Sequence, residues 1–126
     1  MPFLKKNKKR VLVVDDEPLI VGVTHEFLKE EDFEVSSADS AAKALEEMKK
    51  NPIDAVLLDI KLPDTDGLKF LKELRVLYPN VPIIILTGSG YDEKMIQTAI
   101  ENGASGYVTK DTDMENMLVI LKRQLK

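Results

Sequence analysis

The segment AVLLDIKLPDTDG, residues 55–67, decides the fold of this chain. Its first four residues are all aliphatic, and Asp59 follows them directly. A short, continuous apolar run of this kind is typical of a strand that is buried on both faces of a parallel sheet. The segment therefore predicts an interior strand with Asp59 at its carboxyl end.

Similar runs lie on both sides of this segment. We predict strands over residues 11–14, 33–36, 55–58, 83–86 and 106–108. Amphipathic stretches separate these runs, so that strand and helix patterns alternate five times. This alternation favours crossover units and a parallel sheet that is covered on both faces. The sequence therefore predicts an α/β fold, a doubly wound five-stranded parallel sheet in (βα)5 order with helices on both faces.

The stretches between the strands carry helical periodicity. Their apolar residues recur every three or four positions, which places them on one face of a helix. The predicted stripes are Ile20, Val23 and Phe27; Ala41, Ala44, Leu45 and Met48; Phe70, Leu71, Leu74 and Leu77; Ile96, Ala99 and Ile100; and Met114, Met117, Leu118, Leu121 and Leu125. Ser40 and Asp92 are predicted N-caps, and Gly103 is predicted to follow the fourth helix.

Composition excludes several classes of protein. The chain has 126 residues, of which 44% are hydrophobic and 32% are charged. This length suits one domain, and no apolar run approaches the roughly 20 residues of a membrane-spanning helix. The absence of cysteine excludes a disulfide framework, a thiolate nucleophile and a cysteine-based zinc site. The first residues lack the apolar core of a secretion signal, and we predict a cytoplasmic protein.

Positive charge gathers near the amino end. The formal net charge is −4, yet residues 5–10 include five basic side chains: Lys5, Lys6, Lys8, Lys9 and Arg10. The run has no interleaved aromatic residues and no binding module beside it. We therefore predict that residues 1–10 are a solvated basic leader and that residues 11–126 form the domain. We do not expect this domain to bind nucleic acid directly.

Polar residues collect at the carboxyl ends of the predicted strands. Asp15, Asp16 and Glu17 follow the first strand, and Asp59 ends the third. The fourth strand ends in Thr87, and Lys110 lies within two residues of the fifth. In sheets of this type the crevice outside the carboxyl ends of the strands is where ligands bind. These side chains are therefore candidates for a functional site.

The chemistry of this set favours phosphoryl transfer with a metal ion. Carboxylates that share a crevice raise one another's pKa values unless a cation lies among them. Without His or Cys the donors favour a hard ion, Mg²⁺, with Mn²⁺ as a substitute. A carboxylate can also accept a phosphoryl group and become an aspartyl phosphate. Donors to its anionic oxygens would be Lys110, the Thr87 hydroxyl, and the backbone N–H groups of Gly88 and Ser89.

The string at residues 59–67 resembles the phosphoacceptor loop of two-component response-regulator receiver domains. The acidic pair at residues 15–16, Thr87, and residues 103–110 fall in the order and at the spacing of that family. The resemblance covers residues 10–126. It implies a flavodoxin-like strand order of 2-1-3-4-5 and a domain that catalyses its own phosphorylation and dephosphorylation, with no turnover of a separate substrate.

The resemblance also implies a role for each matching residue. Asp59 would be the phosphoacceptor and a metal ligand, Asp16 would bind Mg²⁺ directly, Asp15 would bind it through water, and the Lys61 backbone carbonyl would be a further ligand. Lys110 would bind the phosphoryl oxygens. Thr87 would be the switch hydroxyl, and Tyr107 would be an aromatic residue that turns inward on activation. One position departs from the pattern, because many receivers have a proline after the lysine, where this chain has Asp111.

The partners are also implied by the resemblance. A histidine kinase or phosphotransfer protein would donate the phosphoryl group. An output domain or partner would bind the face made by the fourth helix, fifth strand and fifth helix. The apolar run over residues 117–121 cannot all face one core, because a helical turn takes 3.6 residues. We predict that Val119 or Ile120 contributes to that face, in a partner complex or a homodimer.

Three other functions fit the sequence less well. A flavin-binding protein of similar fold would need a phosphate-cradling loop where this chain has Asp15, Asp16 and Glu17. A phosphatase of the haloacid dehalogenase type would carry Asp-x-Asp on its first strand, whereas Asp15 and Asp16 are adjacent. A degenerate receiver, used as a phosphorylation-independent interaction or dimerisation scaffold, is the third alternative, although the acceptor, the acid pair, the threonine and the lysine are all present.

Overall fold

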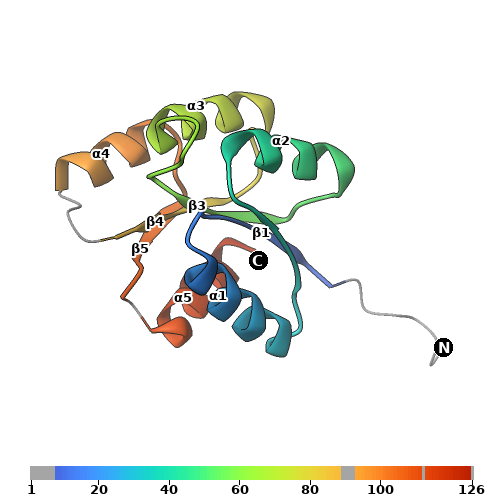
Figure 1. Ribbon diagram of the computed structural model, residues 1–126. Helices are drawn as coiled ribbons and strands as arrows, with labels where there is room; N and C mark the ends of the chain where they lie inside the picture. The colour runs from blue at the N-terminus through green and yellow to red at the C-terminus, as the bar shows by residue number, and fades with distance from the viewer. Residues whose placement is uncertain (1–7, 89–92, 112, 126) are drawn as a thin grey trace.

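The computed structural model describes residues 8–88, 93–111 and 113–125. Its centre is a parallel sheet of five strands in the order β2-β1-β3-β4-β5. The strands are β1 (Arg10–Val14), β2 (Glu34–Ala38), β3 (Ala55–Asp59), β4 (Ile83–Thr87) and β5 (Gly106–Thr109). The helices are α1 (Pro18–Glu30), α2 (Ala41–Lys50), α3 (Gly67–Leu77), α4 (Glu93–Glu101) and α5 (Met114–Gln124). Figure 1 shows α2, α3 and α4 on one face of the sheet and α1 and α5 on the other.

The predicted fold class and strand order are confirmed, and the strand ends differ by one or two residues. The largest difference is in β2, which we predicted over residues 33–36 and which spans Glu34–Ala38. Asp32 adopts a left-handed backbone (φ 71°), so the chain is still turning at Phe33, whose side chain packs in the core. The strand then runs on to Ala38 because Val14 of β1 pairs with it.

The core has two layers, one on each face of the sheet. Alternate residues of a strand point to opposite faces, and β1 follows this rule. Leu12 and Val14 belong to the layer under α2, α3 and α4, whereas Val11 and Val13 belong to the layer under α1 and α5. All residues of β3 and β4 are buried, as expected of strands covered on both faces.

Helix ends follow the predicted signals where the structure describes them. The Ser40 side chain accepts a hydrogen bond from the Lys43 N–H and caps α2. Gly103 adopts a φ of 109° just after α4, a left-handed conformation that glycine tolerates best. Asp92, the predicted N-cap of α4, lies outside the described residues.

Three residues of the predicted apolar stripes are exposed, and for these the prediction was wrong. Val23, Leu77 and Ile100 are 49%, 58% and 50% exposed. In α1 the buried residues are Thr24 and Leu28 instead, so the inward face is rotated by one position from the predicted stripe. Of the two residues proposed for a partner face on α5, Val119 is exposed, whereas Ile120 packs against the core.

The basic amino-terminal run meets the sheet at Arg10, which is the first residue of β1. Its guanidinium donates hydrogen bonds to Ser36 and Glu34 of β2. Residues 1–7 lie outside the described part of the chain. None of the described helices combines the length and apolar character needed to cross a membrane.

Candidate functional site

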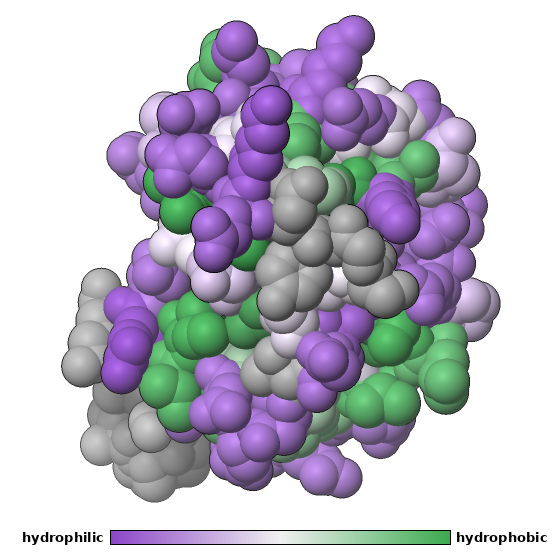
Figure 2. All heavy atoms as spheres, turned by 90° about the vertical axis from the view of Figure 1, so that its left-hand side faces the viewer, coloured by the Kyte–Doolittle hydropathy of each residue, from purple (hydrophilic) through white to green (hydrophobic). Residues whose placement is uncertain are grey.

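Five of the predicted site residues, Asp16, Asp59, Lys61, Gly88 and Lys110, meet at a cleft of about 460 Å³. The loops that follow β1, β3, β4 and β5 line it, with the residues Asp16, Glu17, Ile20, Asp59, Lys61, Leu62, Pro63, Gly88 and Lys110. Figure 2 looks onto the side of the molecule where the strands end, and its hydrophobic side chains form separate groups among hydrophilic ones. The cleft thus lies where the strand order predicts a ligand site.

Lys110 is the centre of the site. Its Nζ lies 3.0 Å from Asp59 Oδ2 and 3.1 Å from Asp15 Oδ2, and it also contacts the Glu17 carboxylate. The Lys110 backbone N–H donates to the Thr87 carbonyl at 2.7 Å, which fixes the residue beside the end of β4. Three acidic side chains, two from the loop between β1 and α1 and one from the end of β3, therefore share a single ammonium group.

The two buried carboxylates are also held by backbone groups. Asp59 Oδ1 accepts the Lys61 N–H at 3.1 Å, and Asp15 Oδ1 accepts the Glu17 N–H at 2.9 Å. Asp15 Oδ2 is buried and accepts no hydrogen bond from the described residues, although Lys110 Nζ lies nearby. A carboxylate oxygen can accept from more than one partner, so Asp15 Oδ2 could hold a ligand in addition to its ion pair with Lys110.

The charges of the site do not balance. Burial raises the pKa of Asp15, and the neighbouring Asp59 charge acts in the same direction against the hydrogen bonds from Glu17 and Lys110. For Lys110, burial would lower the pKa, but hydrogen bonds to Glu17, Asp59 and Asp15 outweigh it and raise the pKa. Lys110 is therefore charged at neutral pH, and one positive charge faces three acidic groups.

A divalent cation fits this donor set. Ligand oxygens of Asp15, Glu17 and Asp59 lie within 4.8 Å of one another. Oxygen donors without nitrogen or sulfur suit a hard ion. Asp16, which we predicted as a direct ligand, is exposed and lines the cleft without joining this group of three. Glu17 was not among our predicted ligands, although its position next to Asp15 and Asp16 in the sequence was a signal for it.

Of the predicted phosphate-binding and switch residues, Gly88 and Lys110 line the cleft. Thr87 is buried, and its hydroxyl donates to the Val108 carbonyl of β5 at 3.3 Å. Gly88 lines the cleft, and Ser89 lies outside the described residues. Tyr107 of β5 is 43% exposed. The Lys110–Asp111 peptide bond, where the sequence departs from the family pattern, is trans.

Gly67 shapes the loop that carries Lys61. The Gly67 N–H donates to the Ile60 carbonyl at 2.8 Å. A Cβ at this position would lie 2.2 Å from the same carbonyl oxygen, a distance that no side chain tolerates. Only glycine allows the start of α3 to approach the end of β3 so closely. This requirement explains the glycine at the end of the quoted segment.

Comparison with known proteins gives the family. The family model described as the response regulator receiver domain matches residues 11–122. A putative response regulator NtrX-like protein of Rickettsia bellii is 36% identical over 115 residues, which cover 90% of this chain and 24% of that protein. The probable transcriptional regulatory protein TcrX of Mycobacterium tuberculosis is 33% identical over 116 residues, which cover 92% of this chain and 49% of that protein.

Solved structures agree with the relatives. A CheY-like response regulator receiver domain protein from Methanospirillum hungatei has a TM-score of 0.89 at 30% identity, with 94% of both chains covered. The BeF3-activated receiver domain of Klebsiella pneumoniae RstA has a TM-score of 0.86 at 30% identity, with 94% of this chain and 99% of that one covered.

The fold, the cleft and these matches define the class of protein. The chain belongs to the response regulator receiver domain family of two-component systems. Its matches to the NtrX-like and ZraR relatives span 24% and 26% of those proteins.

Proposed function

We propose that this domain accepts a phosphoryl group on Asp59 and signals by the change of shape that follows. The observation that carries the proposal is the position of Lys110, whose Nζ lies 3.0 Å from Asp59 Oδ2 within the cleft. An ammonium at this distance from the acceptor oxygen is well placed to bind the oxygens of an incoming phosphoryl group. Asp59 is buried apart from its access to this cleft.

The proposed reaction is a direct displacement at phosphorus. One oxygen of the ionised Asp59 carboxylate attacks the phosphorus atom of a phosphorylated histidine or of acetyl phosphate. The new P–O bond forms while the donor's P–N or P–O bond breaks, and the leaving group keeps the electron pair. Asp59 loses no proton, since it attacks as the carboxylate. Lys110 then turns from the Asp59 oxygen to an oxygen of the bound phosphoryl group.

The acidic residues of the cleft would hold a divalent cation, which we propose is Mg²⁺. Asp15, Asp16, Asp59 and the Lys61 carbonyl are the proposed ligands. The buried Asp15 Oδ2 supports this assignment, because among the described residues it has an ion pair with Lys110 but accepts no hydrogen bond. The placement of Glu17 beside Asp15 and Asp59 adds a further candidate. When bound, such an ion neutralises the charge that builds up during transfer. The chain's own contribution is to hold Asp59 and Lys110 at the same cleft.

The proposed switch runs from Thr87 to Tyr107. The Thr87 hydroxyl donates to the Val108 carbonyl, and Tyr107 is the preceding residue on β5. A phosphoryl oxygen would compete for that hydroxyl, and movement of Thr87 would leave room for Tyr107 to turn inward. Phosphorylation can shift such an equilibrium only by the contacts that it gains in one state. Exposed Val119 on α5 and Tyr107 on β5 support an output face there.

The partners of the whole protein follow as part of the proposal. A histidine kinase or phosphotransfer protein would supply the phosphoryl group, and an output domain or a separate partner would read the switched face. The larger size of the relatives supports an output domain in the whole protein, since the matched part is 24% of the NtrX-like protein and 49% of TcrX.

Intact mass tests the acceptor. The protein is incubated with Mg²⁺ and acetyl phosphate, beside an Asp59→Asn variant and a sample with chelator in place of Mg²⁺. We expect the unaltered protein alone to gain the mass of one phosphoryl group. The same gain in Asp59→Asn, or no gain in folded protein with Mg²⁺ and either acetyl phosphate or phosphoramidate, would contradict the proposal.

A further inference from the structure

The loop between β3 and α3 forms one wall of the cleft and is closed at its base. Lys61, Leu62 and Pro63 line the cleft. At the base, the Gly67 N–H donates to the Ile60 carbonyl, and Lys61 forms an antiparallel bridge with Asp66. These contacts are internal to the loop. They hold its two ends together but do not place its tip relative to the rest of the sheet.

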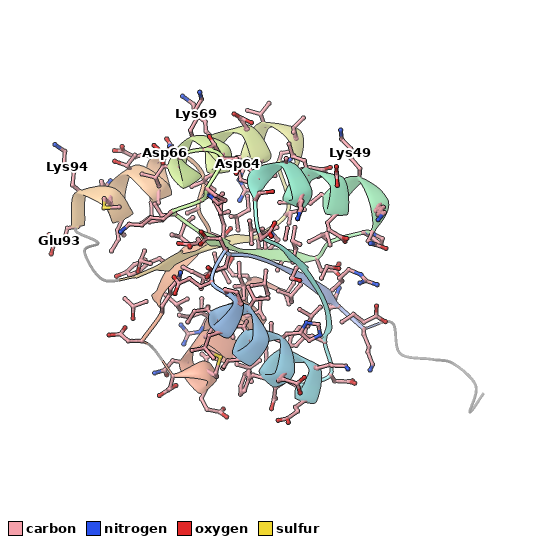
Figure 3. The ribbon with its side chains drawn as sticks, in the orientation of Figure 1. Lys49, Asp64, Asp66, Lys69, Glu93 and Lys94 are labelled. Carbon is pink, nitrogen blue, oxygen red and sulfur yellow. The ribbon has the colours of Figure 1, made fainter. Side chains whose placement is uncertain are left out.

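Asp64 joins the tip of this loop to another element, the helix α2. Asp64 Oδ1 accepts the Ala41 N–H at 3.0 Å, and Asp64 Oδ2 accepts the Ala42 N–H at 3.1 Å. The two partners are the first residues of α2, more than twenty positions earlier in the chain. Figure 3 labels Asp64 beside the start of α2 and Asp66 beside the start of α3. One carboxylate thus connects the loop that lines the cleft to the start of α2.

The start of α2 already has a cap of its own. The first N–H groups of a helix have no partner within the helix, and the Ser40 side chain accepts the Lys43 N–H at 3.2 Å. Asp64 takes the two N–H groups that this local cap leaves. The backbone hydrogen bond from Ala41 lowers the pKa of Asp64, so its charge opposes the positive end of the helix dipole at neutral pH.

The two hydrogen bonds between Asp64 and α2, here called the tether, are close in sequence to the residues that line the cleft. Leu62, two residues before Asp64, packs against the core cluster that contains Ala41 and Ala44 of α2. Lys61 precedes it, and the Lys61 N–H donates to Asp59 Oδ1. A short path therefore runs from the start of α2 through Asp64 and Leu62 to the hydrogen bond that holds the Asp59 carboxylate.

We propose that Asp64 is a positioning residue of the cleft, whose two hydrogen bonds to α2 hold Lys61 and the neighbouring wall in the arrangement that binds the metal ion. The part of this inference that concerns metal binding rests on the proposed function, whereas the part that concerns the position of the loop does not. Because coupling between two sites is reciprocal, occupancy of the cleft should also strengthen the contact between Asp64 and α2.

The first test measures the loop without metal. Hydrogen exchange of the Lys61 amide is compared among the unaltered protein, Asp64→Ala and Ser40→Ala. Both variants remove acceptors from the same end of α2, but only Asp64→Ala frees the loop. We expect exchange at Lys61 to be about ten-fold faster in Asp64→Ala, as a local opening becomes easier, and unchanged in Ser40→Ala. Equal acceleration in both variants would reduce Asp64 to a cap of α2 and overturn the proposal.

The second test measures Mg²⁺ affinity by titration in the same three proteins. Residues that orient metal ligands from behind typically alter affinity by about ten-fold or more when removed. We expect Asp64→Ala to bind Mg²⁺ about ten-fold more weakly and Ser40→Ala to bind it as the unaltered protein does. In the unaltered protein, Mg²⁺ should also slow exchange at the Ala41 and Ala42 amides. Unchanged affinity in Asp64→Ala, with no slowing at these amides, would overturn the part that concerns metal binding.

The two tests distinguish a failure of this proposal from a failure of the proposed function. If the unaltered protein binds no Mg²⁺ or takes no phosphoryl group, the proposed function fails, and exchange at Lys61 still decides whether Asp64 holds the loop. Should Asp64→Ala fail to fold, Asp64→Asn replaces it, because Asn keeps one acceptor oxygen and is neutral. We expect an intermediate acceleration at Lys61 in that variant, and exchange at the unaltered rate would count against the tether.

Discussion

Two cationic side chains lie at opposite ends of the strands, and their surroundings differ. At the amino ends of β4 and β5, Arg75 donates to the carbonyls of Gly103, Val81, Tyr78 and Pro79, and its Nη2 lies 2.7 Å from Gly103 O. At the carboxyl ends, Lys110 is surrounded by three carboxylates instead. Neutral carbonyls complete the hydrogen bonding of Arg75, so its surroundings carry no excess of negative charge.

The difference separates a structural end from a functional one. The carbonyls around Arg75 receive donors and need nothing further. Around Lys110 the negative charge is in excess, and Asp15 Oδ2 accepts no hydrogen bond from the described residues. A cleft in which three carboxylates face one ammonium is suited to a further cation. We therefore expect changes to Arg75 to alter stability without altering phosphorylation, and changes to the charged side chains around Lys110 to alter ligand binding.

The largest effect should come from closing the space at Gly67. A Cβ there would meet the Ile60 carbonyl oxygen at 2.2 Å, so Gly67→Ala must displace the loop or the start of α3. We expect a loss of about 4 kcal/mol in the free energy of unfolding, together with loss of phosphorylation, measured by urea unfolding and intact mass.

Gly22 provides the matched control for Gly67→Ala. A Cβ at Gly22 would meet nothing within 4 Å, and Gly22 lies inside α1. Replacing a helical glycine by alanine stabilises a helix by up to about 1 kcal/mol, so Gly22→Ala should be neutral or stabilising. Similar losses in the two variants would show that the close approach at Gly67 is not what requires glycine.

The next effect is expected at Arg75. Arg75→Ala removes donors from several carbonyls at once, which should lower the free energy of unfolding by about 2–3 kcal/mol. Arg75→Lys should recover less than half of this loss, because an ammonium cannot reproduce the fork of the guanidinium. Phosphorylation of the folded protein should persist in both variants. A loss of phosphorylation without a loss of stability would contradict the division between the two ends.

Lys110 and Arg75 show what could and what could not be predicted from the sequence alone. The aliphatic runs and their alternation with helices predicted the sheet and the ends of its strands, because burial on both faces leaves a local pattern. Asp15, Asp59 and Lys110 could be assigned to one cleft because parallel strands end at one side of the sheet. The role of Arg75 depends on loops about thirty positions away in the chain, and no local pattern encodes such a contact.

The errors have the same origin. Val23 was assigned to the inward face of α1 from spacing, yet the packing of α1 against the sheet selects Thr24 and Leu28. Glu17 was passed over as a ligand because the order of ligands within an acidic run depends on side-chain directions, which spacing does not give. The tether from Asp64 to α2 was likewise invisible, since it joins residues that are more than twenty positions apart.

Replacing Asp15 should have a smaller effect on stability, and it should stabilise the protein rather than destabilise it. The folded-state pKa of Asp15 is raised above the usual 3.8, mainly by burial, so stability falls as the pH rises from 3.8 through the folded pKa and stays lower at neutral pH. Asp15→Asn removes this cost and keeps an oxygen for the Glu17 N–H. Without metal, the variant should unfold at a temperature a few degrees higher, by about 1–5 °C.

With Mg²⁺, the unaltered protein should have a higher unfolding temperature than Asp15→Asn, the reverse of the order without metal. Added Mg²⁺ should raise the unfolding temperature of the unaltered protein more than that of Asp15→Asn, because only the former keeps the full set of carboxylates. Thermal unfolding with and without Mg²⁺ gives both comparisons. A variant that is less stable than the unaltered protein without metal would contradict the excess of negative charge at this end.

The smallest effect concerns pH and Asp64. Its pKa is lowered from 3.8, first by the hydrogen bond from Ala41. The stability that this contact contributes is therefore present above the unfolded-state pKa and is lost as the pH falls through the folded-state value. Urea unfolding of the unaltered protein and Asp64→Ala at about pH 7, 5 and 3 should give a constant difference that narrows only at the last value. A difference that widens in acid would show that the ionised carboxylate does not make the contact.

The central claim is that Asp59, and no other residue, carries the phosphoryl group. Borohydride reduces an acyl phosphate to the corresponding alcohol, so treatment of the phosphorylated protein should convert the acceptor aspartate to homoserine. Peptide mass analysis should find homoserine at position 59 alone, and only after incubation with Mg²⁺ and a phosphoryl donor. Homoserine at Asp15, Asp16 or another acidic residue, with position 59 unchanged, would contradict the account.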